Sequence, residues 1–130
     1  MKAQRNQSKA AELSSDEKLL AALCHLSLFF LPIIIPLVLW LREKNQSTPS
    51  TFVIVQARQS LVYQIIFMVV LVGVGLFVIL LSILLVGYLF VPAYLILLFS
   101  GVLYAAYAGY QSFLGYDFRY YYLGDKLEEF

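Results

Sequence analysis

His25 is the one histidine of this 130-residue chain, and the one cysteine, Cys24, stands beside it in an apolar run. A lone histidine there can ligate a haem or another pigment, or it can hydrogen-bond a neighbouring group in a packed interior. Adjacent residues on a helix point about 100° apart and no carboxylate accompanies this pair, so the two make a poor metal site. We expect a structural histidine with neither metal nor cofactor, and pigment binding through His25 is the alternative.

The sequence contains no pattern that predicts catalysis. From Gln59 to Tyr116, 58 consecutive residues include no Asp, Glu, Lys or Arg, and the chain has neither a glycine-rich phosphate loop nor a nucleophile paired with a base. It also lacks the basic, aromatic-rich patch of a nucleic-acid-binding protein. We therefore expect a protein that is not an enzyme and does not bind nucleic acid.

The composition predicts that lipid covers most of the surface. Hydrophobic residues make up 62% of the chain and charged residues 13%, whereas soluble domains average roughly 45–50% apolar residues. A crossing helix needs about 20 apolar residues, so the uncharged block holds two crossings and a turn. We predict an all-α integral membrane protein built on a hairpin of two spanning helices, with the lipid bilayer as its first partner.

The first apolar segment, Leu19 to Leu41, is 23 residues long and contains Pro32 and Pro36. Prolines remove backbone donors and clash with the preceding turn, so they kink or break a helix. The segment is either one kinked crossing or two half-helices that enter and leave on one side, giving three or four membrane helices. The broken form places all nine Lys and Arg residues on one side, as the positive-inside rule favours, and we prefer it.

The charge pattern also divides the chain. We expect a flexible polar tail over residues 1–15, a single helical membrane domain over 16–125 and an acidic end over 126–130, with hydrophobic segments at about 19–41, 61–86 and 90–114. Ser14 or Ser15 can cap the first helix. The stretch from Phe52 to Gln64 carries glutamines among apolar residues, and we expect it to lie at the membrane interface.

Small residues follow one another at helical spacing in the last apolar segment. They are Gly101, Ala105, Ala108, Gly109 and Ser112. Such a face lets two helix backbones approach closely within a membrane. The face packs either on the preceding helix of the same chain or on another subunit.

Four pieces of sequence together resemble one known family. They are residues 17–26, 36–44, 52–61 and 115–120, and their motif residues are His25, Pro36, Gln56, Ala57, Gln59, Phe118, Arg119 and Tyr120. The set resembles the small prokaryotic membrane-protein family of unknown function that is related to the Tic-twenty component of chloroplast import. Two positions depart from that pattern, since Gln56 stands where histidine is usual and Tyr121 where proline is usual.

The resemblance implies four helices, two of them before residue 52, and a prokaryotic cytoplasmic (inner) membrane. It supplies no activity, so our functional expectation is a non-catalytic accessory subunit or assembly factor bound to other membrane-protein subunits. One alternative is an oligomeric translocation or conducting element, similar to the chloroplast relatives. A second is a pigment- or haem-associated subunit that uses His25.

Overall fold

The structure, a computed structural model, describes residues 12–121 and 123–127, and this part of the chain is helical without a strand. Its elements are α2 (Ser15–Leu26), η1 (Ser27–Phe29), α3 (Ile34–Lys44), α4 (Thr51–Ser82), η2 (Val86–Phe90), α5 (Val91–Phe113) and α6 (Leu123–Leu127). The all-α prediction is confirmed. Most of the predicted N-terminal tail and the last three residues lie outside the described residues.

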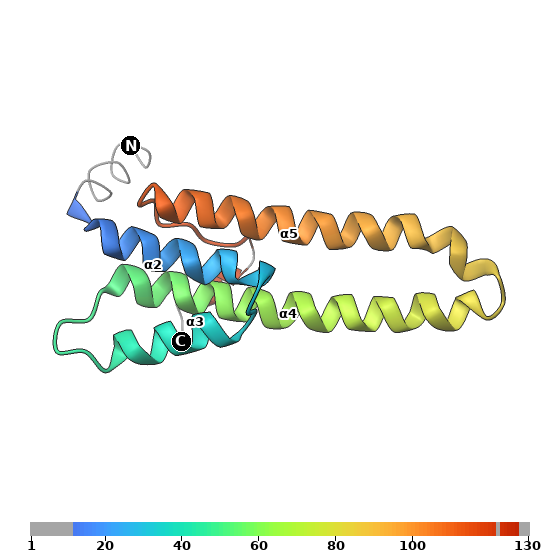
Figure 1. The fold of residues 1–130 in the computed structure, drawn as a ribbon, viewed down its shortest axis with the longest axis horizontal. Helices are drawn as coiled ribbons and strands as arrows, with labels where there is room; N and C mark the ends of the chain where they lie inside the picture. The colour runs from blue at the N-terminus through green and yellow to red at the C-terminus, as the bar shows by residue number, and fades with distance from the viewer. Residues whose placement is uncertain (1–11, 122, 128–130) are drawn as a thin grey trace.

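A long antiparallel hairpin of α4 and α5 forms the body of the molecule (Figure 1). By length and composition, α4 and the segment Val86–Phe113 could each cross a membrane. Only 11% and 6% of their most apolar windows are buried inside the protein, so most of their apolar side chains face outward. Helices α2 and α3 lie beside one half of this hairpin and leave its other half bare (Figure 1).

A capping box begins α2. The Ser14 amide donates to Glu17 Oε2 at 2.8 Å, and the Glu17 amide donates to Ser14 Oγ at 3.2 Å. Glu17 also accepts a 2.6 Å hydrogen bond from Ser50 Oγ, and that bond lowers the pKa of the Glu17 carboxyl. Because Ser50 is the N-cap of α4, this contact holds the starts of α2 and α4 together.

The proline-containing segment is broken into two helices, which decides between the two alternatives for its shape. The α-helix ends at Leu26, and Ile33 adopts a positive φ of 70° just before α3 begins. Pro36 then occupies the first turn of α3, where a missing backbone N–H costs little. As a result α3 runs back beside α2 (Figure 1).

Gln64 of α4 bonds the backbone groups that this break releases. Its Oε1 accepts from the Ile33 amide at 2.7 Å, and its Nε2 donates to the Cys24 carbonyl at 2.9 Å. Ser60 Oγ also donates to the Cys24 carbonyl. A broken backbone within an apolar protein is stable only when such partners are present.

The stretch from Phe52 to Gln64 forms the first turns of a long helix, and its place at the membrane interface stays a prediction. These residues belong to one continuous 32-residue helix, α4. Gln56, Gln59 and Gln64 are fully buried within the protein. Gln56 and Gln64 bond α2, the start of α3 and the C-terminal tail, whereas Gln59 has no hydrogen-bond partner in the described structure.

The small residues of α5 lie inside the molecule. Ala105, Ala108 and Ser112 have no exposed surface, and Gly109 is buried. A Cβ at Gly109 would lie 2.8 Å from Leu26 Cγ of α2, and one at Gly101 would overlap the Phe67 ring of α4. The face is therefore occupied by contacts within the chain.

We predict that Ala105→Leu destabilises the protein purified in mild detergent, because three extra heavy atoms have no space at a site with no exposed surface. Overpacking of this kind costs about 1–3 kcal/mol. The control is Ser100→Leu, a similar enlargement at an exposed position of α5, which we expect to be neutral. Thermal unfolding measures both, and an unchanged melting temperature for Ala105→Leu would contradict the packing described here.

Candidate functional site

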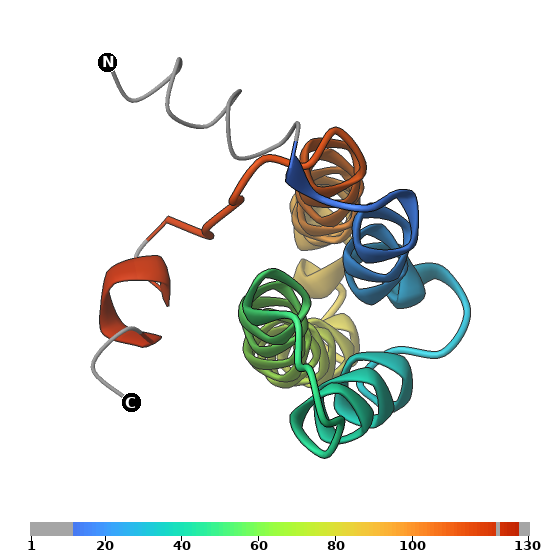
Figure 2. The ribbon, with the colours of Figure 1, turned by 90° about the vertical axis from the view of Figure 1, so that its left-hand side faces the viewer.

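The polar end of the bundle, where the chain enters and leaves it, holds a buried hydrogen-bonded network. The tail after α5 runs along the side of α4 and α5 at this end (Figure 2). The network joins α2, α4, α5 and this tail through His25, Gln56, Ser112, Asp117, Phe118 and Tyr120. Side chains up to 95 residues apart in sequence therefore meet.

His25 stands at the centre of the network. Its Nδ1 lies 2.8 Å from Tyr120 Oη and its Nε2 lies 3.0 Å from Gln56 Oε1. The ring has no exposed surface, and burial lowers the pKa of His25 to about 4. The imidazole is consequently neutral near pH 7 and can donate from only one of its nitrogens.

The orientation of Gln56 fixes the tautomer of His25. Gln56 Nε2 faces Asp117 Oδ1 and the Phe118 carbonyl, each at 3.0 Å, and neither oxygen can donate. Gln56 Oε1 must therefore accept, both from Ser112 Oγ at 3.1 Å and from His25. His25 thus carries its proton on Nε2, and Tyr120 donates its hydroxyl proton to Nδ1.

Aromatic rings hold Tyr120 in place. The ring of Tyr63 on α4 stacks on it with centroids 4.0 Å apart and planes within 3°. Tyr104 and Phe118 meet it edge-on at 5.1 Å and 5.0 Å. Burial raises the pKa of Tyr120 well above its usual 10, so its hydroxyl keeps the proton that it donates to His25.

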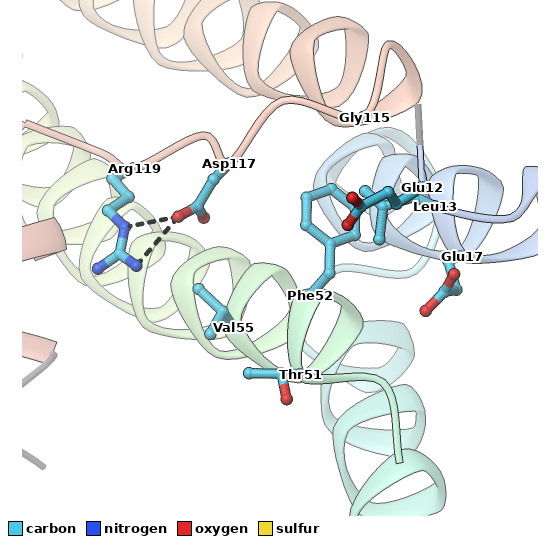
Figure 3. Close-up of a pocket in the computed structure, with 9 residues that line it drawn as sticks. All are labelled: Glu12, Leu13, Glu17, Thr51, Phe52, Val55, Gly115, Asp117 and Arg119. Carbon is cyan, nitrogen blue, oxygen red and sulfur yellow. Dashed lines mark hydrogen bonds and ion pairs between the residues drawn. The ribbon is translucent and has the colours of Figure 1, made fainter. Parts of the chain in front are cut away.

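A surface cavity of about 500 Å³ adjoins the network at the same end. Figure 3 shows Phe52 between the carboxylates of Glu12, Glu17 and Asp117, with Arg119 on Asp117. Arg119 donates from two nitrogens to Asp117 Oδ2, at 3.1 Å and 3.3 Å, while Asp117 Oδ1 accepts from Gln56. Within the described residues no group of three or more His, Cys, Asp or Glu could hold a metal ion.

The predicted motif residues lie in three places. His25, Gln56, Phe118 and Tyr120 meet in the network, whereas Arg119 lies at the surface beside Asp117. Pro36, Ala57 and Gln59 are buried elsewhere in the bundle. Both polar atoms of the Gln59 side chain are buried without a hydrogen-bond partner in the described structure.

Several residues of the site were not found from the sequence. Ser60, Gln64 and Asp117 each bond across elements, and Tyr63 stacks on Tyr120 and donates to the Gly101 carbonyl at 2.7 Å. A usable signal existed for two of them, because Ser60 and Gln64 stand one turn apart in the uncharged stretch that follows Arg58. A polar pair in such a stretch indicates a buried bond.

The geometry does not support the haem or pigment alternative. Both nitrogens of His25 are hydrogen-bonded, so an axial ligand bond would first have to break one of these contacts. The network instead fastens the tail to the bundle, because each nitrogen of His25 and both polar atoms of the Gln56 side chain are hydrogen-bonded.

The model of the Magnetosome magnetite crystal formation protein family (MamF/MmsF) matches residues 16–124. The chain belongs to this family. The match covers α2 to α5 and the tail with Tyr120, so it includes both the network and the hairpin. No curated protein and no solved structure matches the chain.

This match overturns the resemblance to the Tic-twenty-related family. The family found over residues 16–124 is the magnetosome family, and nothing found supports a relation to chloroplast import. The four pieces of sequence led to the wrong family because membrane helices in many proteins are flanked by similar charged and apolar residues. Such short motifs therefore do not identify a family.

We predict that Tyr120→Phe lowers the thermal stability of the detergent-solubilised protein. The ring contacts remain, but the buried His25 Nδ1 loses its donor, and such a loss costs about 1–3 kcal/mol. Tyr110→Phe removes a hydroxyl from an exposed ring on α5 and serves as the control. Equal melting temperatures for the two variants would show that the network does not lock the tail.

Proposed function

We propose that this protein is a non-catalytic membrane protein that takes part in magnetite crystal formation, as an accessory component of a larger complex in the magnetosome membrane. The observation that carries the proposal is the family match over residues 16–124. The description of that family names both the compartment and the process. The physical properties of the chain agree with a place in a membrane.

Outward-facing apolar side chains support membrane insertion. Val69, Ile79 and Leu80 on α4 and Ile96 and Leu103 on α5 are each more than 60% exposed. The core helix of a soluble protein would have these side chains inside. A continuous apolar surface of this length is stable in lipid and would aggregate in water.

Helix lengths suggest how the chain lies in the bilayer. From Gln64 to Ser82, 18 residue steps extend about 27 Å, close to the hydrocarbon thickness of about 30 Å. Helices α2 and α3 have 12 and 11 residues, each too few to cross. We therefore infer that α2 and α3 enter and leave on one side, with the His25 network at that interface.

The positive charges favour one orientation. All nine Lys and Arg residues of the sequence precede Gln59 or follow Tyr116, so none lies in the α4–α5 hairpin beyond the polar end. By the positive-inside rule the polar end faces the cytoplasm. The sequence suggested the cytoplasmic (inner) membrane, whereas the family description favours the magnetosome membrane.

A structural role for His25 favours a non-catalytic protein. Its ring nitrogens bond Tyr120 and Gln56 in the core, out of reach of a substrate. A conducting element is less well supported, because the segment from Gln59 to Tyr116 carries no charged residue or histidine that could line an ion path. The small face of α5 is used internally, so a partner subunit would bind another surface.

We predict that the gene restores crystal formation in a magnetite-forming cell that lacks its own family member. Crystal number and size are measured by electron microscopy, and the amount of tagged protein in the magnetosome membrane fraction is measured on the same cells. Normal protein levels in that membrane with unrestored crystals would contradict the proposed role.

The variant His25→Gln tests the proposal that the protein is non-catalytic. Glutamine can both donate and accept at the centre of the network, but it cannot act as an acid or base. We expect this variant to restore crystals in proportion to its amount in the membrane. Abolished crystal formation at a normal protein level would instead assign His25 a chemical role.

A further inference from the structure

The two ends of the molecule differ in width. At the polar end α2 and α3 lie beside α4 and α5, whereas the far half of the described molecule consists of α4 and α5 with their turn alone (Figure 1). The bond from the Ile33 amide to Gln64 marks the level at which the extra helices end. Figure 2, a view along the long axis, shows the wide end with the tail beside it.

The surface of the α2–α3 hairpin is suited to lipid. Its tip exposes Phe29, Phe30 and Leu31, and α3 continues this apolar surface with Ile34 and Val38. Arg42 and Lys44 follow on the last turn of α3, where the cation of Lys44 lies 5.6 Å from the Trp40 ring centroid. An apolar tip with a basic, aromatic base is typical of a segment inserted at the headgroup–acyl boundary.

The placement proposed above puts this hairpin in the headgroup region of one leaflet only, with its tip at the boundary of the hydrocarbon. The level of Gln64 lies about 27 Å from the far end of α4, so α2 and α3 add volume at one interface and none at the other. Each helix is about 10 Å wide. Curvature expands the convex leaflet of a bilayer. A protein that is wider at one interface therefore fits a curved bilayer when its wide end lies in the convex leaflet.

We propose that the protein binds preferentially to strongly curved membrane, with the α2–α3 end in the convex leaflet. The inference rests on the proposed membrane placement and identifies the lipid surface that this placement favours. Since the basic residues orient the wide end towards the cytoplasm, the matching surface is a bilayer that bulges into the cytoplasm or encloses a small vesicle there. Such membranes have a convex cytoplasmic leaflet.

The test uses the full-length protein in giant vesicles from which narrow membrane tubes are drawn. A fluorophore is attached at Gln46→Cys, an exposed position between α3 and α4, since the natural Cys24 is buried. An impermeant quencher distinguishes copies with the wide end outside from copies with it inside. We expect outward copies to be enriched in the tube by roughly twofold or more and inward copies to be depleted, an effect on the scale of bilayer-deformation energies.

The opposite response of the two orientations is the decisive feature. A general affinity for tubes would enrich both orientations, and a cylindrical protein would show no enrichment for either. Both of these results would overturn the proposal while leaving the role in crystal formation intact, because no mineral is present. Failure to insert into the vesicles at all would overturn the membrane placement on which both proposals depend.

A matched pair of variants tests the hairpin itself. Phe30→Gln with Ile34→Gln makes the tip polar and should withdraw it from the acyl chains, so the difference between orientations should shrink at least by half. Phe30→Leu with Ile34→Leu keeps the tip apolar and should retain the difference. Equal sorting by both pairs, at equal thermal stability, would contradict a role for the α2–α3 tip.

Discussion

The hydrogen bonds from Gln64 to the broken first segment are the contacts on which the remaining architecture depends. They bind the Cys24 carbonyl at the end of α2 and the Ile33 amide at the start of α3. Without them, the Ile33 amide would lose its hydrogen-bond partner, and the Cys24 carbonyl would keep only the hydroxyls of Ser27 and Ser60. With them, the chain can reverse beside α4 and place both short helices at the same end of the molecule.

This reversal also determines where the polar groups lie. Because the same hydrogen bonds fix the end of α2, His25 lies within reach of Gln56, and the tail after α5 can add Tyr120 and complete the network. The part of the hairpin from Gln59 to Tyr116 carries no charged side chain and can face lipid. The separation of a bonded polar end from a bare apolar hairpin underlies both the proposed membrane placement and the proposed preference for curvature.

The sequence predicted those features that depend on local composition. Uncharged length predicts two long apolar helices, and Pro32 with Pro36 predicts the break. The partner of the break could not be predicted, because Gln64 lies 31 residues from Ile33 and nothing local relates them. The site was partly found, since motif residues such as His25 and Tyr120 were selected, but their contact spans 95 residues and depends on the path of the tail.

The family assignment failed for a related reason. A basic residue after an apolar run, or a glutamine in a helix, follows from membrane physics and is shared by proteins of different descent. The match over residues 16–124 draws on the whole chain, including the tail that completes the network. Fold class is therefore readable from short patterns in this protein, whereas family and function are not.

The most direct test of the account is the accessibility of single cysteines in the cell membrane. Cysteine is introduced at Ser15, Gln46 and Leu89, which are exposed positions at the start of α2, between α3 and α4 and in the turn before α5. The account predicts that an impermeant thiol reagent labels Ser15→Cys and Gln46→Cys from the cytoplasmic side and Leu89→Cys from the opposite side. Labelling of Ser15→Cys and Gln46→Cys from opposite sides would mean that the first segment crosses the membrane. It would contradict the one-sided placement of α2 and α3, the orientation and the preference for curved membrane together.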